Sequence, residues 1–197
     1  IQKGLEGISH LRETKVVRSN RHPGVSLDVI LEVEGLGKSR AQRIAEAWEK
    51  QKGMREIMVF LQGHGVSSGF ALRIYRVFGP QTINRVKENP YGLAREIKGI
   101  GFILADRIAG SLGIEANSPL RIGAGVLYTL EKFTESGNCF APLDLLTKNA
   151  SSLLKIETAA VERIVEKLGA HGDVVLEEPR ESQGTRVYPQ ALYQAER

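Results

Sequence analysis

The chain has 197 residues, with 27 Lys and Arg against 23 Asp and Glu, which gives a net charge of +4. This length allows one or two domains, and the mild basic excess is compatible with a local patch for nucleic acid without proving one. The single cysteine, Cys139, excludes an internal disulfide framework and fits a reducing, cytoplasmic compartment. No apolar run approaches the length of a membrane span and no signal peptide is visible, so we expect no membrane partner.

Residues 1–113 are predicted to form a helical region built from a repeated sequence. The copies start at Gly35, Gly65 and Gly99 and read GLGKSRAQRI, GVSSGFALRI and GIGFILADRI. Each continues with an aliphatic residue and then a small one, and an Ala and an Ile recur six and nine positions after the first Gly. This common register indicates one supersecondary unit used three times. A worn fourth copy at Gly7 is left open, because Glu13 stands where the Ala is expected.

Each copy is predicted to be a helix, a tight glycine hairpin and a second helix. The first Gly permits the positive φ that ends a helix, and the small residue (Gly37, Ser67 or Gly101) starts the next one. The Ala lets the two helices approach closely; these residues are Ala41, Ala71 and Ala105. Unpaired amides at the second helix's N-terminus lie at the positive end of the dipole, where a phosphate binds favourably.

The copies differ in the residues that follow the hairpin. The first is the best candidate phosphate site, because cationic and hydroxyl side chains lie beside its amides, and the second is a plausible one. The DNA-binding candidates are Gly35, Gly37, Lys38, Ser39, Arg40 and Arg43 in the first copy, and Gly65, Ser67, Ser68 and Arg73 in the second. In the third copy, Gly99 and Gly101 are followed by the apolar residues 102–104, which favour packing. Similar turns occur in bundles that bind nothing, so purely structural repeats remain the alternative.

Glycine and proline punctuation predicts where these helices end. Gly53, Gly79 and Gly113 are expected to close the second helices of the three copies, and Asn89 is expected to cap a helix that begins with a first-turn proline. Trp48 lies on an apolar helical stripe and is predicted to be a core residue.

Residues 114–190 have a different pattern, which favours a small winged-helix-like α+β domain. Helices are predicted at 119–133, 143–147 and 158–168, followed by two β-prone runs, 174–176 and 186–188, around a polar loop. A generic α+β connector is the alternative. The loop at 177–181 is mostly acidic, which argues against a wing that grips DNA.

The sequence contains no candidate for catalytic or metal-binding chemistry. The four histidines have no metal-ligand spacing with one another or with Cys139, so we assign no metal and no catalytic residue. Gly37-Lys38-Ser39 matches the end of a nucleotide-binding phosphate loop, but that loop needs a Gly where Glu32 stands. We therefore expect no cofactor in this chain and no ATP hydrolysis by it.

The stretch NPYGLAREIKGIGFILADRIAGSLGI, residues 89–114, resembles the N-terminal extension of RecD/TraA-type DNA helicases, which are relatives of the exodeoxyribonuclease V alpha subunit. Looser resemblance covers GLGKSRAQRIAEAW upstream and GNCFAP and VYPQALYQAE downstream. It implies that the parent protein is an ATP-dependent 5′–3′ helicase of DNA recombination or repair, with ATP and magnesium as its cofactors. It also implies that residues 191–197 begin the connection to an ATPase motor that this chain lacks. Ser67 departs from the pattern, since it replaces the second hairpin glycine.

The predicted fold is therefore mainly α, with tandem helix-hairpin-helix repeats followed by a small winged-helix-like domain. The predicted function is a DNA-binding or scaffolding extension of a helicase. Its partners would be the DNA phosphate backbone, bound without sequence preference, and the helicase motor of the same chain. Two alternatives stay open: a protein-interaction module whose repeats only pack, and a junction- or lesion-binding repair subunit.

Overall fold

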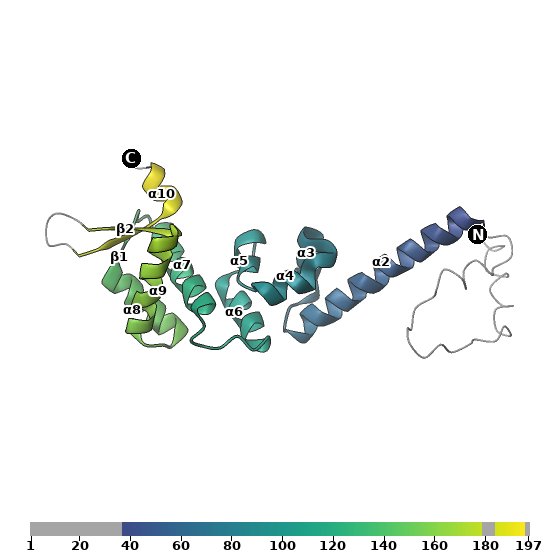
Figure 1. The fold of residues 1–197 in the computed structure, drawn as a ribbon, viewed down its shortest axis with the longest axis horizontal. Coiled ribbons are helices and arrows are strands. Elements are labelled where there is room, and N and C mark those ends of the chain that lie inside the picture. The colour runs from purple at the N-terminus through teal and green to yellow at the C-terminus, as the bar shows by residue number, and fades with distance from the viewer. Residues whose placement is uncertain (1–36, 179–183, 196–197) are drawn as a thin grey trace. The chain divides into compact units, whose positions relative to one another are not determined.

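The computed structural model describes residues 37–178 and 184–195, so Gly35, Glu32 and the possible fourth copy lie outside the described residues. Helices dominate, and one small sheet lies near the C-terminal end (Figure 1). The elements in chain order are α2 (Lys38–Gly63), α3 (Ser68–Phe78), the short 3-10 helix η3 (Gly79–Gln81), α4 (Thr82–Glu88), α5 (Gly92–Glu96), α6 (Phe102–Ser111), α7 (Pro119–Glu135), β1 (Ala141–Pro142), α8 (Leu143–Leu154), α9 (Thr158–His171), β2 (Val174–Glu177), β3 (Arg186–Pro189) and α10 (Gln190–Ala195). This order confirms the predicted mainly α fold class.

Two compact units divide between Lys52 and Gly53. The described part of the first unit, residues 37–52, is the beginning of α2. There Ala41 has no exposed surface, whereas Trp48 is 45% exposed. The prediction of a core Trp48 is wrong, because an apolar stripe shows which residues share a helical face and does not show that another element covers that face.

Helix α2 also corrects the prediction for Gly53, since it continues through that residue to Gly63. A glycine inside a helix costs only about 1 kcal/mol relative to alanine, so it does not by itself end a run of backbone hydrogen bonds. The helix ends instead just before Gly65, whose φ is +79°. Gly79 and Gly113 follow α3 and α6 with φ of +55° and +85°, as the punctuation predicted.

Two apolar cores fill the second unit. The hairpin core joins the end of α2 to α3, α4, α5 and α6, and its buried members are Ile57, Leu61, Val66, Ala71, Ile74, Val86, Leu93, Ile97, Ile100 and Ile108. The C-terminal core joins another face of α6 to α7, α8, α9 and the sheet, and its buried members include Phe102, Ala105, Ala109, Ile122, Val126, Leu130, Leu146, Val161 and Val187. Helix α6 therefore contributes side chains to both cores.

The C-terminal part of this unit contains helices α7, α8, α9 and α10 and the three strands. Helices α7, α8 and α9 pack on one another, and the sheet is antiparallel in the order β1-β3-β2. The predicted hairpin is confirmed, because Val175 pairs with Tyr188 and Leu176 pairs with Val187. Helix α8 runs seven residues beyond its predicted end at Thr147 and stops at Lys155, whose φ is 57°.

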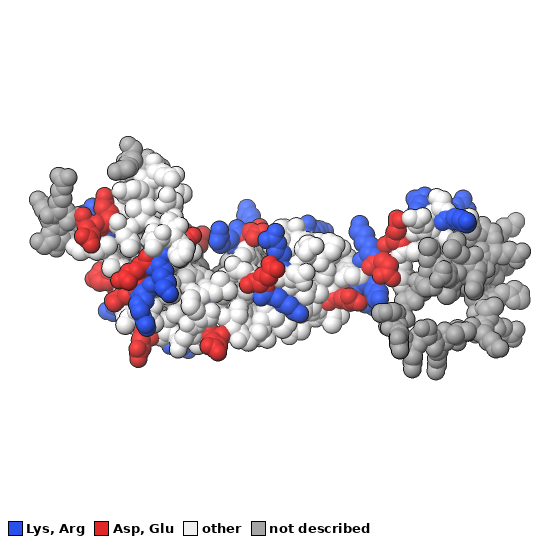
Figure 2. Space-filling model, in the orientation of Figure 1, with Lys and Arg blue, Asp and Glu red and all other residues white. Residues whose placement is uncertain are grey.

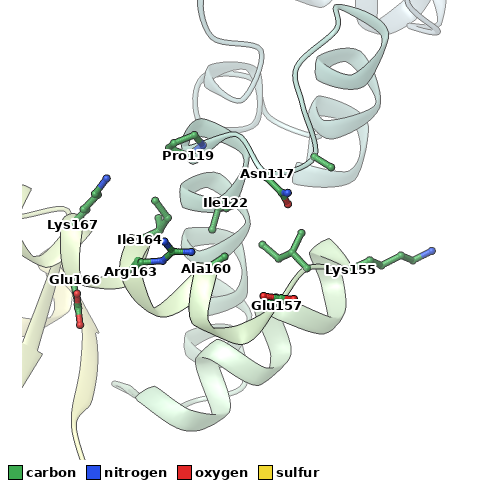
Figure 3. A pocket seen from close by; sticks show the side chains of 12 residues that line it. Asn117, Pro119, Ile122, Lys155, Glu157, Ala160, Arg163, Ile164, Glu166 and Lys167 are labelled. Atoms are coloured by element: carbon green, nitrogen blue, oxygen red, sulfur yellow. The ribbon is translucent and has the colours of Figure 1, made fainter.

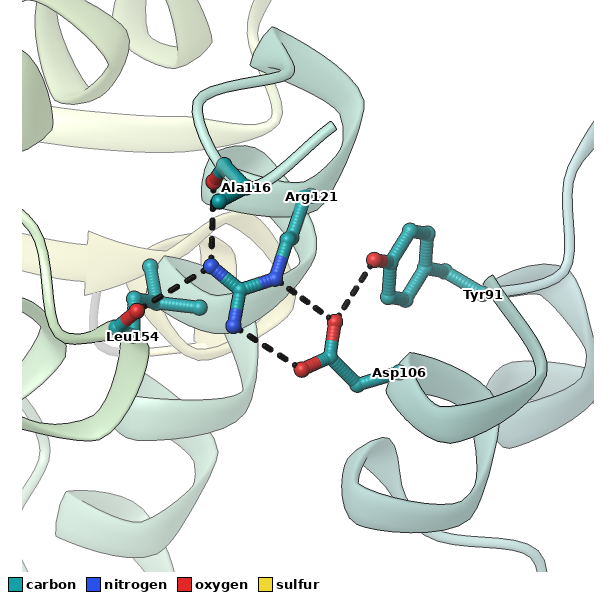
Figure 4. A network of polar contacts seen from close by, with 5 residues as sticks. All are labelled: Tyr91, Asp106, Ala116, Arg121 and Leu154. Carbon is teal, nitrogen blue, oxygen red and sulfur yellow. Dashed lines mark hydrogen bonds and ion pairs between the residues drawn. The ribbon is translucent and has the colours of Figure 1, made fainter. Parts of the chain in front are cut away.

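A polar network holds α6 against α7 and α8 (Figure 4). The Arg121 guanidinium donates to both carboxylate oxygens of Asp106 at 2.9 and 3.0 Å, and also to the carbonyls of Ala116 and Leu154. The Tyr91 hydroxyl donates to Asp106 Oδ1 at 2.7 Å. Burial, followed by this hydrogen bond and the Asp106 charge, raises the pKa of Tyr91. Asp106 therefore has a structural role in joining the hairpin helix to the C-terminal helices.

Candidate nucleic-acid interface

The second hairpin has the geometry that its sequence predicts. After α2, Gly65 takes the left-handed conformation, and the Val66 amide donates to the Leu61 carbonyl at 3.0 Å. Val66 is 3% exposed and plugs the gap between the helices. Ser67 is extended and precedes α3, where the Ala71 amide donates to the Ser67 carbonyl at 2.8 Å. The amides between them belong to the first turn of a helix, where intrahelical acceptors are lacking.

The third hairpin repeats this geometry at the equivalent positions. Gly99 has φ of +90°, Ile100 is 3% exposed, and extended Gly101 precedes α6. The Ala105 amide donates to the Gly101 carbonyl at 3.2 Å, as Ala71 does to Ser67. The same side-chain pattern therefore produces the same turn twice, because a positive φ and a buried aliphatic plug are needed in both.

The first hairpin is described from its second glycine onward. The Ala41 amide donates to the Gly37 carbonyl at 3.1 Å, which is the same helix start as in the other two copies. Lys38, Ser39, Arg40 and Arg43 are all exposed, and the first turn of α2 has no acidic residue. The predicted cations therefore lie on the first two turns of α2, near a helix N-terminus, where a phosphate is favoured.

Two predicted site residues of the second hairpin, Ser68 and Arg73, make contacts within the chain. Ser68 Oγ accepts a hydrogen bond from Gln62 Nε2 at 2.9 Å, while Ser67 is exposed and makes no side-chain cap. Arg73 Nη1 donates to the Lys98 carbonyl at 2.8 Å, and its guanidinium lies over the Phe70 ring, 5.3 Å from the centroid. Arg73 thus contacts the segment just before the third hairpin, a link that no local pattern predicts.

The apolar residues of the third hairpin divide between the two cores and solvent. Phe102 is 3% exposed and stacks between Tyr91 and Tyr128, with ring centroids 5.8 and 5.3 Å away. Leu104 packs against the hairpin core, whereas Ile103 is 55% exposed. The packing role predicted for residues 102–104 therefore holds for the first and third of them.

Arg107 is a neighbour of the hairpins that the sequence reasoning missed. It is exposed on α6, and its Cδ lies 3.6 Å from where a Cβ on Gly65 would be. The signal was present in the repeat, because an Arg stands eight positions after the first Gly in all three copies: Arg43, Arg73 and Arg107.

Charges of both signs are interspersed over the face of the molecule in Figure 2. A groove of about 830 Å³ lies between the α6–α7 connection, the α8–α9 turn and α9 (Figure 3). Its lining includes Ile122 and Ile164 as well as Lys155, Arg163 and Glu157. Both signs of charge lie at this groove, so it lacks the single-sign field that a polyanion such as DNA requires.

Membrane spans and metal clusters are both missing from the described residues. No helix within 37–178 and 184–195 is long and apolar enough to cross a membrane. Within the same ranges, no three His, Cys, Asp or Glu side chains are placed to hold a metal ion together.

Comparison with known proteins points to the region that holds the second and third hairpins, and the first hairpin lies before the matched residues. Residues 50–140 match the family described as ATP-dependent RecD2 DNA helicase HHH domain, where HHH denotes helix-hairpin-helix. A Deinococcus radiodurans protein named ATP-dependent RecD2 DNA helicase is 27% identical over 137 residues, which cover 69% of this chain and 19% of the relative. These findings confirm the predicted resemblance to RecD-type helicases, and the chain carries a helix-hairpin-helix domain of that type.

Proposed function

We propose that this chain is the DNA-binding N-terminal region of an ATP-dependent 5′–3′ DNA helicase, and that its hairpins hold the phosphate backbone. The helicase part of the proposal is supported by the matches to RecD2 helicases, and ATP and magnesium would be bound by the motor of such a protein. The DNA-binding part is supported chiefly by one observation. Three copies in register each start a helix after a small residue, and the first copy adds exposed cations to that helix start.

The first hairpin is the proposed primary phosphate site. The amides after Gly37 would bind one backbone phosphate, and Lys38 and Arg40 would add charge-assisted contacts. Such contacts position a protein on nucleic acid without reading bases, so binding would be independent of sequence.

The test replaces both cations, Lys38→Ala and Arg40→Ala, and measures binding of a short fluorescent DNA by anisotropy across a salt series. We expect weaker binding for every sequence, and a salt slope shallower by about one unit for each phosphate that the variant no longer neutralises. Lys50→Ala with Arg55→Ala is the matched control: both residues are exposed on α2 and remove the same charge. Lys50 lies about 18 Å along the helix from Lys38, beyond reach of the same phosphate. Equal losses of affinity in both double variants would show a general charge effect and remove the first hairpin from the site.

The C-terminal part would serve as a winged-helix-like scaffold in this proposal. The order α7, β1, α8, α9, β2, β3 with a three-stranded antiparallel sheet supports that assignment. Exposed residues of α9 alternate in sign, with Glu162 and Glu166 beside Arg163 and Lys167, which favours a role other than gripping DNA.

An interaction module is the second candidate function, and one observation favours it. The apolar third hairpin inserts Phe102 into the C-terminal core, so at least this copy packs against protein. A chain that binds no DNA at low salt would support this candidate over the DNA-binding one.

A further inference from the structure

The beginning of α2 presents two large apolar side chains to solvent on one face. Ile44 is 47% exposed and Trp48, one helical turn further on, is 45% exposed. Among the described residues, neither side chain belongs to either apolar core. Tryptophan is enriched at binding surfaces, because its large ring gains much from a partner that covers it. The pair therefore marks a surface that a partner can cover.

Cationic side chains extend this face at both ends. Residues four positions apart lie on the same face of a helix, one turn from each other. The face, which we call the α2 ridge, consists of four residues at intervals of four: Arg40, Ile44, Trp48 and Lys52. Glu46 and Glu49 lie about 100° or more from Trp48 around the helix axis. The α2 ridge is thus an apolar centre with a cation on either side, and the acidic residues lie off it.

The charge of this segment indicates what kind of partner the α2 ridge fits. Residues 37–52 contain five Lys and Arg against two Glu, a net charge of +3 in a chain whose total is +4. An anionic partner is therefore favoured. Surfaces that bind single-stranded nucleic acid combine cations, which follow the backbone, with aromatic rings, on which bases stack. The α2 ridge has both components within about 18 Å of helix.

We propose that the α2 ridge binds single-stranded DNA, with one base stacked on the Trp48 indole and neighbouring phosphates contacted by Arg40 and Lys52. The inference rests on the proposed function, in which this chain binds DNA. It adds a base contact to the phosphate contact of the first hairpin, whose Lys38 lies about 15 Å along the helix from Trp48. Every base has a π-face, so the stacking tolerates any sequence. A duplex is disfavoured at the α2 ridge, because a base must first leave its own stack to reach Trp48.

The experiment uses the fluorescence of Trp48, which is the only tryptophan in the 197-residue chain. Emission therefore reports on the α2 ridge alone, and a base that stacks on the indole quenches it. The chain is titrated with three probes of equal length: a thymidine single strand, a single strand of abasic sites with the same phosphates, and a duplex. Fluorescence anisotropy of labelled probes gives the three affinities.

Variants separate stacking from charge and from general hydrophobicity. Trp48→Ala removes the ring, and Trp48→Phe keeps an aromatic face. Val59→Ala is the matched control, because Val59 is also on α2, is 64% exposed and lies outside the α2 ridge. Lys52→Ala is compared with Lys50→Ala, which removes the same charge from an exposed position off the α2 ridge. Thermal melts followed by circular dichroism check that each exposed-site variant folds as the unaltered chain does.

We expect the thymidine strand to quench Trp48, while the abasic strand and the duplex leave its emission nearly unchanged. In Trp48→Ala, affinity for the thymidine strand should fall on the order of tenfold, as for the loss of one stacked base, and affinity for the other two probes should change less than about twofold. Trp48→Phe should recover part of the loss, and Val59→Ala should change nothing. Lys52→Ala should weaken binding of the thymidine strand more than Lys50→Ala does.

Three results would overturn the proposal. Saturation by the thymidine strand without quenching would show that no base reaches Trp48. Equal losses for the thymidine and abasic strands in Trp48→Ala would show that the ring does not act by stacking. A dimer of the chain that Trp48→Ala dissociates, together with unquenched emission, would assign the α2 ridge to a second copy. Failure of the proposed function looks different, since the unaltered chain would then bind none of the three probes in a salt-dependent way.

Discussion

Removing the Phe102 ring should be the most damaging single change to the third hairpin. The ring is 3% exposed and stacks between Tyr91 and Tyr128 in the C-terminal core. Phe→Ala in a core typically lowers the free energy of unfolding by about 3–5 kcal/mol. Each aromatic pair that is lost is worth roughly 0.5–1.5 kcal/mol beyond its buried area. A chain of this size loses about 2–4 °C of Tm per kcal/mol, so we expect a drop of roughly 6–20 °C.

The neighbouring residue supplies the control for this prediction. Ile103 lies on the same helix and is 55% exposed, so Ile103→Ala should change the free energy of unfolding by no more than about 0.5 kcal/mol. Urea denaturation followed by circular dichroism measures both variants. If Phe102→Ala lowers the free energy of unfolding by no more than about 1 kcal/mol beyond the effect of Ile103→Ala, the ring does not hold the hairpin against the C-terminal core. The different packing roles assigned to Phe102 and Ile103 would then be wrong.

Three further predictions concern the network and the missing nucleotide site. Arg121→Ala should lower the free energy of unfolding by roughly 1–3 kcal/mol, because it leaves the half-buried Asp106 carboxylate with too few hydrogen-bond donors. A double-mutant cycle with Asp106→Ala should show that the two decreases are less than additive. The folded state raises the pKa of Tyr91 above its ordinary value of 10.0, so the unfolded chain loses the phenolic proton at a lower pH than the folded chain. The stabilisation from the protonated phenol is therefore complete below pH 10 and is lost as the pH rises above 10. Denaturation at pH 9 and pH 11 should show a smaller decrease in the free energy of unfolding for Tyr91→Phe than for the unaltered chain. The purified chain should release no phosphate from ATP with or without DNA, since Glu32 stands where the phosphate loop needs glycine, and DNA-stimulated turnover would contradict this.

The hairpins could be predicted from the sequence because every feature of them is local. A positive φ at Gly65 and Gly99, a buried aliphatic residue next to it and a small residue before the helix all lie within three positions. Three copies in one register made that pattern specific. The C-terminal helices and the β2–β3 hairpin were accessible for the same reason, since periodicity and a polar turn are short-range signals.

The predictions that were wrong are those in which the final structure depends on residues far away in the sequence. Gly53 was predicted to end a helix because glycine has a low helix propensity, yet α2 continues through it. Trp48 has the spacing of a core residue and stays exposed, because spacing does not reveal which element, if any, covers a face. The contacts that organise the interface, Arg73 with Lys98 and Arg121 with Asp106, join residues 25 and 15 positions apart, and a single sequence gives no means to pair them.

Helix α6 explains why, under the proposed DNA binding, the second and third hairpins and the C-terminal helices should respond together. Its residue Ile108 is fully buried in the hairpin core, while Phe102 and Ala105 are buried in the C-terminal core. Between these faces it carries Asp106, which holds Arg121 of α7, and Arg107, which lies beside the second hairpin. The third hairpin therefore cannot shift without opening one core or breaking the Asp106–Arg121 bonds. A phosphate bound at this turn would act on a stiff assembly, so DNA binding should slow hydrogen exchange in α7 as well as in α6, and protection confined to the hairpins would show that the two cores are independent.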